Sequence, residues 1–142
     1  MKDGLTILIA EDDDGHARLI QERFEDVGVS NPLKRFRDGA EAWEFLTGAG
    51  GLTVGEEYLL LLDIRMPGLD GVEVLRRMKA DERLKTIPVI MLTTTDDPRE
   101  VENCYKLGCS SYLTKPVEFK KFAEVVKRLG LFLMVIKVDK FK

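Results

Sequence analysis

The sequence predicts an α/β fold in which a five-stranded parallel sheet carries helices on both faces. Short apolar runs with strong strand propensity alternate five times with segments of helical periodicity. The run at 58–62 is apolar at every position, as expected of a central strand that helices cover on both sides. With 142 residues, of which 44% are hydrophobic and 33% charged, the chain suits a single globular domain.

The first two strand-helix units lie in the first third of the chain. Residues 5–10 predict a strand, and an acidic cluster separates them from a helix that Gly28 is suited to cap. A second strand over 33–37 follows Pro32, and Asp38-Gly39 then turns the chain into a second helix. The core candidates are Ala17, Leu19, Ile20, Phe24 and Val27 in the first helix, and Ala42, Trp43, Phe45 and Leu46 in the second.

Three further units complete the fold. Four glycines within 48–55 predict a surface loop before the third strand. Pro98 suits the first turn of the fourth helix, and the last helix is expected from about residue 117. The strands expected in this part are 58–62, 89–92 and 110–113, and the core candidates of the third helix are Val72, Val74, Leu75 and Met78.

Chemically active residues stand just past four of the five strands. They are Glu11 and Asp12 after the first, Asp63 after the third, Thr93 after the fourth and Lys115 after the fifth. The carboxyl ends of parallel strands share one edge of the sheet, where ligands of such folds bind. Three carboxylates at one edge repel unless a cation lies among them, and ligation by oxygen alone favours Mg²⁺.

Each of these residues also has an ordinary structural explanation. Acids that open a helix are typical N-caps, and Asp13 or Asp14 suits that role. Asp63 follows four leucines, where a buried carboxylate needs a partner. Lys115 is either that structural counter-ion or a functional group, and Thr93 alone is typical of a turn.

Taken together, the groups suit transfer of a phosphoryl group to a carboxylate. Asp63 is the best placed nucleophile and needs no general base, because a carboxylate is ionised at pH 7. Glu11, Asp12 and Mg²⁺ would neutralise charge on the incoming group. Thr93 and Lys115 would each bond one of its oxygens.

Four motifs together resemble the response-regulator receiver domains of the CheY-like type. The motifs are ILIAEDD at 7–13, LDIRMPGLDG at 62–71, PVIMLT at 88–93 and GCSSYLTKP at 108–116. The resemblance covers about residues 5 to 128. It implies a doubly wound, flavodoxin-like sheet with strand order 2-1-3-4-5.

The resemblance also implies a function for the residues at the strand ends. Asp63 would accept phosphate from a partner histidine kinase. Asp12 and Asp63 would ligate Mg²⁺ directly, Glu11 would act through water, and the backbone carbonyl of Arg65 would be the third protein ligand. The Arg65 side chain is expected to affect the lifetime of the phosphoryl group.

The same resemblance implies a two-state switch. The Thr93 hydroxyl would move to the phosphate while the Tyr112 ring turns inward, although Tyr112 could equally be a static aromatic of an edge strand. The Lys115-Pro116 bond would be cis. The changed surface would be that of the fourth helix, the fifth strand and the fifth helix.

The end of the chain departs from this pattern. We divide the sequence into a receiver domain, 1–128, and an apolar extension, 129–142, which is either a helical continuation or an extended arm and is too short for an output domain. Such a patch needs a partner, and we favour a homodimer over packing of the tail onto its own domain. The expected interface residues are Phe122, Leu129, Leu131, Phe132, Met134 and Val135.

Other function classes are less consistent with the sequence. The net charge of −3 and the lack of a basic block disfavour nucleic-acid binding, and no segment is typical of a signal peptide or membrane span. Two cysteines are too few for a disulfide framework or zinc site, and we expect them to be reduced and half-buried in a cytoplasmic protein. His16, the only histidine, is expected to be a surface or packing residue.

Two alternatives to the switch stay open. One is a receiver-like interaction module that works without phosphorylation. The other is a phosphatase with an aspartyl nucleophile, but such enzymes need a second acid two residues later, where Arg65 stands. We therefore expect no enzyme beyond self-catalysed phosphorylation and dephosphorylation. The glycine-rich loop and the tail are together similar to small stand-alone response regulators paired with phytochrome-type kinases.

Overall fold

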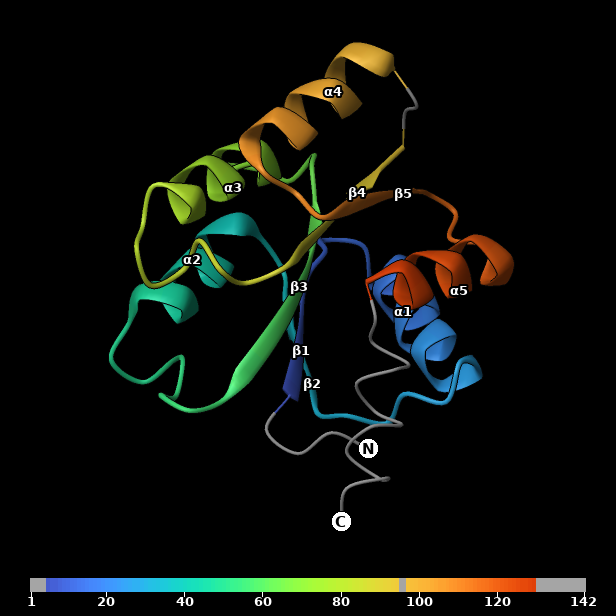
Figure 1. Cartoon of the computed structure of the whole chain (residues 1–142), viewed down its shortest axis with the longest axis horizontal. Coiled ribbons are helices and arrows are strands. Elements are labelled where there is room, and N and C mark those ends of the chain that lie inside the picture. The colour runs from blue at the N-terminus through green and yellow to red at the C-terminus, as the bar shows by residue number, and fades with distance from the viewer. Residues whose placement is uncertain (1–4, 95–96, 130–142) are drawn as a thin grey trace.

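Strands and helices alternate strictly along the computed structural model, which describes residues 5–94 and 97–129 (Figure 1). The elements are β1 (Leu5–Ala10), α1 (Asp14–Asp26), β2 (Leu33–Phe36), α2 (Gly39–Thr47), β3 (Glu57–Asp63), α3 (Gly71–Lys79), β4 (Val89–Thr93), α4 (Pro98–Leu107), β5 (Ser111–Thr114) and α5 (Phe119–Arg128).

All five strands are parallel, in the order β2-β1-β3-β4-β5. This order confirms the predicted doubly wound sheet. Figure 1 shows α1 and α5 on one face, and α2, α3 and α4 on the other. Within the described part of the chain, none of the helices has the length and apolar character needed to cross a bilayer.

Alternation along the strands divides the core in two. Ile7 and Ile9 of β1 point toward α1 and α5, where they pack with Phe24 and Phe122. Leu8 points to the opposite face, where the cores of α2, α3 and α4 lie. Because β1, β3 and β4 are covered on both faces, they tolerate almost no polar residue before their carboxyl ends.

Several boundaries differ from the sequence prediction. Asp63 and Thr93 are the last residues of β3 and β4, rather than the first residues after them. β5 begins one residue later than expected, at Ser111, and α5 begins at Phe119 rather than near 117. Val117 is buried in the core and Glu118 is extended, so the helix starts only after both.

The core faces of the helices are narrower than predicted. In α2 only Ala42 and Leu46 of the expected residues are fully buried, because the sheet lies against that one stripe. Phe45 is partly buried and packs at the edge, with its ring centroid 5.1 Å from that of Phe36. The residues that are likewise only partly buried are Leu19, Val27, Trp43 and Val72.

The two cysteines are free and fully buried, rather than half-buried. Burial raises the pKa of the Cys109 thiol to about 12, and it also raises the pKa of Cys104. Thiols without an accessible thiolate are poor nucleophiles and poor metal ligands. Both residues therefore pack on the α3–α4 side of the core.

The structure contradicts one residue of the predicted dimer interface. Phe122 is 0% exposed and meets Phe24 edge to face, with ring centroids 4.7 Å apart. It therefore holds α5 against α1 and has no surface to offer a second copy. Leu129 is partly buried against the same core. The other expected interface residues, Leu131, Phe132, Met134 and Val135, lie outside the described residues.

Candidate functional site

The residues predicted from the strand ends do meet at one edge of the sheet. β1 and β3 pair in register up to Ala10 and Leu62, so that Glu11 and Asp63 follow side by side. Asp63 in turn pairs with Leu92, next to Thr93, in β4. The Lys115 backbone N–H donates to the Thr93 carbonyl at 2.7 Å, which places Lys115 directly after β5 at the same edge.

Three carboxylates form the acidic centre of this site. Oxygens of Glu11, Asp12 and Asp63 all lie within 4.8 Å of one another. Glu11 is 0% and Asp63 is 3% exposed, whereas Asp12 faces solvent. The donor set consists of three carboxylates, and the exposed Asp12 leaves one side of the cluster open to solvent. These features fit a hard divalent cation such as Mg²⁺.

Lys115 supplies the counter-charge. Its Nζ lies 3.0 Å from Asp63 Oδ2 and 2.5 Å from Glu11 Oε1, and its side chain is almost fully buried. Burial alone would lower the pKa of Lys115, but the adjacent Glu11 and Asp63 carboxylates outweigh burial and raise it. The ammonium group therefore stays charged between two acids.

Within the acidic cluster, the carboxyl group of Glu11 has a clearly raised pKa. Its burial and the neighbouring Asp63 carboxylate raise the pKa of Glu11 to about 7, against the lowering effect of Lys115. The backbone N–H of Asp13 donates to Glu11 Oε2 at 3.2 Å. A cation at the site would favour the ionised form of Glu11, because it offsets the repulsion from Asp63.

Two basic residues near Glu11 could not be assigned to the site from the sequence. The Arg35 guanidinium, from β2, donates to the Glu11 carbonyl at 3.0 and 2.8 Å and holds this turn in place. His16 Nδ1 lies 3.5 Å from Lys115 Nζ and 3.7 Å from Glu11 Oε1, and its side chain is 39% exposed, so it borders the site from the surface. Asp13 caps α1 by accepting the His16 backbone N–H at 2.8 Å.

Thr93 and Arg65 share a neighbour that sequence patterns do not reveal. Glu100, from the first turn of α4, accepts from Thr93 Oγ1 at 3.4 Å and from Arg65 Nη2 at 3.0 Å. The Arg65 side chain thus points toward α4, while its backbone N–H donates to Asp63 Oδ1 at 3.3 Å. One carboxylate joins the β3–α3 loop to the hydroxyl at the end of β4.

Tyr112 lies beside the site rather than in it. Met91 pairs with Tyr112, and Thr93 is two residues farther along the same strand, so Thr93 and Tyr112 belong to the same face of the sheet. The Tyr112 ring is partly buried and meets the Tyr105 ring of α4 edge to face, with centroids 5.9 Å apart. The Lys115-Pro116 peptide bond is cis, as expected.

A glycine brings the β3–α3 loop back against Asp63. The Gly71 N–H donates to the Ile64 carbonyl at 2.9 Å. A Cβ atom at position 71 would lie 2.1 Å from the Asp63 carbonyl oxygen, far inside contact distance. Asp70 caps the helix that starts there by accepting the Glu73 N–H. The loop position therefore requires glycine.

Comparison with known families decides the identity of this arrangement. Residues 7–127 match the family model described as the response regulator receiver domain. The chain belongs to this family. Receiver domains are signalling components of two-component systems, and the acidic cluster, Thr93 and Lys115 occupy the edge where the family's motifs converge.

Solved structures and curated relatives agree with the receiver fold. A receiver domain from Rhodospirillum rubrum is 41% identical with a TM-score of 0.77, covering 92% of this chain and 94% of that one. The bacteriophytochrome response regulator RtBRR is 37% identical with a TM-score of 0.76, covering 88% and 77%. Response regulator Rcp1 from Synechocystis sp. is 35% identical, covering 89% of this chain and 86% of its own. The crystal structure of its Mn²⁺-bound form has a TM-score of 0.72, covering 91% and 94% at 34% identity.

Proposed function

We propose that this receiver domain accepts a phosphoryl group on Asp63 from a histidine kinase in a Mg²⁺-dependent reaction. One observation carries the proposal: Asp63 is a buried carboxylate whose oxygens meet both an acidic cluster and the Lys115 ammonium. In the reaction a carboxylate oxygen attacks phosphorus while the P–N bond to the kinase imidazole breaks. The electron pair of that bond stays on the imidazole, so no general base is needed.

Several side chains around Asp63 would stabilise the negative charge of the phosphoryl group. Lys115, 3.0 Å from Asp63 Oδ2, is placed to bond one phosphoryl oxygen, and the Thr93 hydroxyl is placed to bond another. Asp12 and Asp63 would hold Mg²⁺ directly, Glu11 would hold it through water, and the Arg65 backbone carbonyl would be the third protein ligand. The ion supplies neutralisation of charge on the incoming phosphoryl group. The solved Mn²⁺-bound form of Rcp1 supports the assignment of a divalent ion to this chain.

The phosphoryl group then biases a two-state switch. The Thr93 hydroxyl leaves Glu100 for the phosphoryl group, and the space it vacates lets Tyr112 turn inward from Tyr105. The output surface comprises α4, β5 and α5. Tyr105 and Phe119, 42% and 48% exposed, are the large apolar residues that this surface already presents.

The input partner is a sensor histidine kinase, which we place with this chain in the cytoplasm. Relatives named as phytochrome response regulators support a phytochrome-type kinase. The chemistry is self-catalysed phosphorylation and dephosphorylation of the chain itself. A phosphatase would need an acid where Arg65 stands, and that side chain is turned to Glu100. A phosphorylation-independent interaction module is the remaining alternative.

A homodimer through the tail also remains a prediction. With Phe122 buried in its own protomer, the prediction rests on Leu129 and the tail residues. It expects a chain ending at Arg128 to elute at a smaller size class than the full chain. If the truncated and full chains eluted at the same size class, the prediction of a tail-mediated dimer would be wrong.

The central experiment is labelling with acetyl phosphate and Mg²⁺, followed by intact mass. The wild type should gain one phosphoryl group, Asp63→Asn should gain none, and the control Asp26→Asn, at the far end of α1, should label normally. Labelling of Asp63→Asn at the wild-type rate would show that the acceptor is wrong. A folded wild type that takes phosphate neither from acetyl phosphate nor from a kinase would favour the interaction module.

A further inference from the structure

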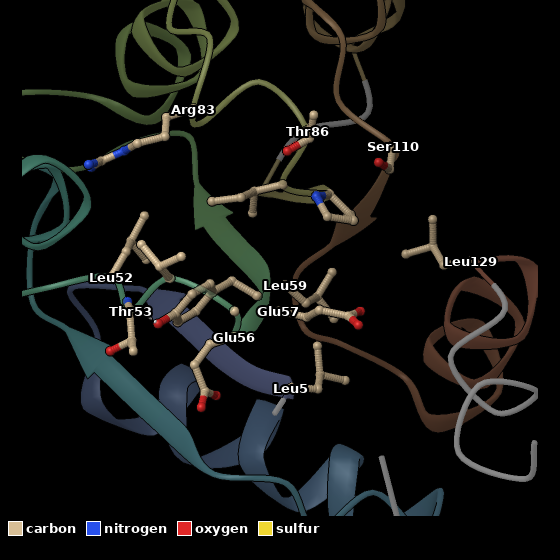
Figure 2. A pocket seen from close by; sticks show the side chains of 15 residues that line it. Leu5, Leu52, Thr53, Glu56, Glu57, Leu59, Arg83, Thr86, Ser110 and Leu129 are labelled. Atoms are coloured by element: carbon tan, nitrogen blue, oxygen red, sulfur yellow. Dashed lines mark hydrogen bonds between the residues drawn. The ribbon is translucent and has the colours of Figure 1, made fainter. Parts of the chain in front are cut away.

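An apolar cavity lies at the opposite end of the sheet from Asp63. It has a volume of about 550 Å³ and opens at the amino ends of four strands, beside Leu5 of β1, Glu57 of β3, Pro88 before β4 and Ser110 before β5 (Figure 2). Neither the phosphoacceptor chemistry nor the α4–β5–α5 surface uses it. Its size is typical of pockets that bind a ligand or a few large side chains.

The cavity wall is mainly apolar. Leu52, Tyr58 and Ile87 contribute to it, and Val54 on the loop above is 100% exposed. The loop is tied to β3 by a hydrogen bond in which the Thr53 N–H donates to the Tyr58 hydroxyl at 2.8 Å. An open, apolar cavity of this kind is stabilised by an apolar occupant that removes its wall from water.

Leu129 identifies where such an occupant is attached. It is the last described residue, it follows α5 directly, and its side chain lines the cavity. Figure 2 shows Leu129 on one side of the cavity and Leu52 on the other. The chain continues from that wall, after Gly130, with six consecutive apolar residues, LFLMVI at 131–136. Six extended residues span roughly 20 Å, which is ample to enter a cavity that begins at the preceding side chain.

The charges match as well. Two acids, Glu56 and Glu57, and one base, Arg83, line the cavity, and the Arg83 guanidinium donates to the Leu46 carbonyl at 3.3 Å. The apolar run is followed by KVDKFK at 137–142, with three lysines and one aspartate. A segment whose apolar part enters the cavity would bring this positive end near the acidic rim.

We propose that residues 131–136 occupy this cavity in their own chain. The tether at Leu129 is the reason for choosing the same chain over a second copy. A segment attached at the cavity wall has an effective concentration in the millimolar range, which exceeds ordinary protein concentrations. This proposal and the tail-mediated homodimer exclude each other, because residues 131–136 that fill the cavity of their own chain are not available to a second copy. A second copy or a small apolar ligand are the competing occupants.

Disulfide trapping in the full chain tests the occupant directly. Val54→Cys and Met134→Cys are combined and oxidised by copper phenanthroline in air, which removes one hydrogen from each thiol. Val54 is fully exposed, so its replacement should not disturb the fold. The native cysteines are buried, so they should not form competing disulfides. The matched control pairs Met134→Cys with Glu102→Cys. Glu102 is exposed on α4, which lies on the face of the sheet opposite α5 (Figure 1).

The proposal expects an intrachain link that forms about tenfold faster for the Val54 pair than for the control pair. It also expects amide hydrogens at 53–59 to exchange several-fold faster in a chain ending at Leu129. A link between chains whose yield rises with protein concentration would overturn the proposal in favour of a second copy. Equal rates for the two pairs, or unchanged exchange at 53–59, would overturn it in favour of another occupant.

Discussion

Arg65 and Glu100 form an ion pair, with 3.0 Å between Nη2 and Oε2, that ties the β3–α3 loop to the first turn of α4. The other oxygen of Glu100 lies 3.4 Å from the Thr93 hydroxyl. Glu100 therefore links the β3–α3 loop, which follows the phosphoacceptor Asp63, to Thr93, the residue that is proposed to sense the phosphoryl group. Exposure of Arg65 makes the pair weak in itself, so its importance lies in orienting Glu100.

Replacing Glu100 tests whether this arrangement restrains the switch. In Glu100→Ala the Thr93 hydroxyl no longer has to leave a carboxylate before it bonds the phosphoryl group. We expect a roughly two- to fivefold higher rate of labelling by acetyl phosphate, the size of one modest hydrogen bond. Intact mass against time measures it. Glu102→Ala, on the same helix and paired with Lys106, is the control and should label like the wild type. A slower Glu100→Ala would contradict the restraint.

Removing Lys115 should destabilise the metal-free protein. Lys115→Met leaves the buried Glu11 and Asp63 carboxylates without their cation. We expect a loss of about 3 kcal/mol in the free energy of unfolding, as for other buried pairs that lose one partner. Urea denaturation at pH 7 measures the loss, and saturating Mg²⁺ should recover part of it. Lys106→Met, which breaks an exposed pair, should change stability little. Equal effects of the two changes would show that Lys115 is not a structural counter-ion.

The pKa of Glu11 predicts a pH dependence of the metal-free protein. This pKa is raised from 4.5 to about 7, so the folded protein binds the proton more tightly than the unfolded chain. The contribution is fully present below the unfolded value and is lost as pH rises through the folded value. The free energy of unfolding should therefore decrease between pH 5 and 8 relative to Glu11→Gln, which lacks this proton. Parallel curves for the two proteins, measured by urea unfolding, would rule out the shift.

Mg²⁺ should reverse this trend. Ligation requires deprotonated carboxylates, so the affinity for Mg²⁺ should rise with pH until Glu11 is ionised, near pH 7. Titration of the thermal midpoint with Mg²⁺ at pH 6 and pH 8 measures it, with a larger shift expected at pH 8. Asp12→Asn should lose most of the Mg²⁺-dependent shift at both pH values. An unchanged shift in that variant would place the ion elsewhere.

Gly71 should be intolerant of a side chain. The added methyl in Gly71→Ala would meet the Asp63 carbonyl at 2.1 Å, so the loop or the end of β3 must move. We expect about 1–3 kcal/mol of destabilisation and slower labelling of Asp63. Gly50→Ala is the control, since no atom lies within 4 Å of a Cβ placed there. If both variants matched the wild type in stability and labelling, the close approach at Gly71 would be unimportant.

The sequence predicted the site more accurately than its surroundings. Glu11, Asp12, Asp63, Thr93 and Lys115 were identified because they end or follow buried strands, and parallel strands bring their carboxyl ends together. Periodicity predicted less well which helical residues are buried. Trp43 and Phe45 fit a helical face, yet α2 offers the sheet only the narrower stripe of Ala42 and Leu46.

The neighbours that modify the site have no sequence pattern. Arg35, His16 and Glu100 come from β2, α1 and α4, and each reaches the site only because its element packs against that edge. Phe122 illustrates the converse. The sequence prediction placed it in a dimer interface, but the position of α1 puts Phe24 against its ring.

By itself, the sequence determined the alternation of strands and helices, the parallel sheet and the acidic, hydroxyl and ammonium groups at its carboxyl edge. These follow from local propensity and from a topological rule, so they need no coordinates. Tertiary structure alone decided the partners of Glu11 and Thr93, the burial of Phe122 and the cavity beside Leu129. Those features depend on the rotation of each helix and on contacts between residues far apart in the chain, which packing sets and local periodicity does not encode.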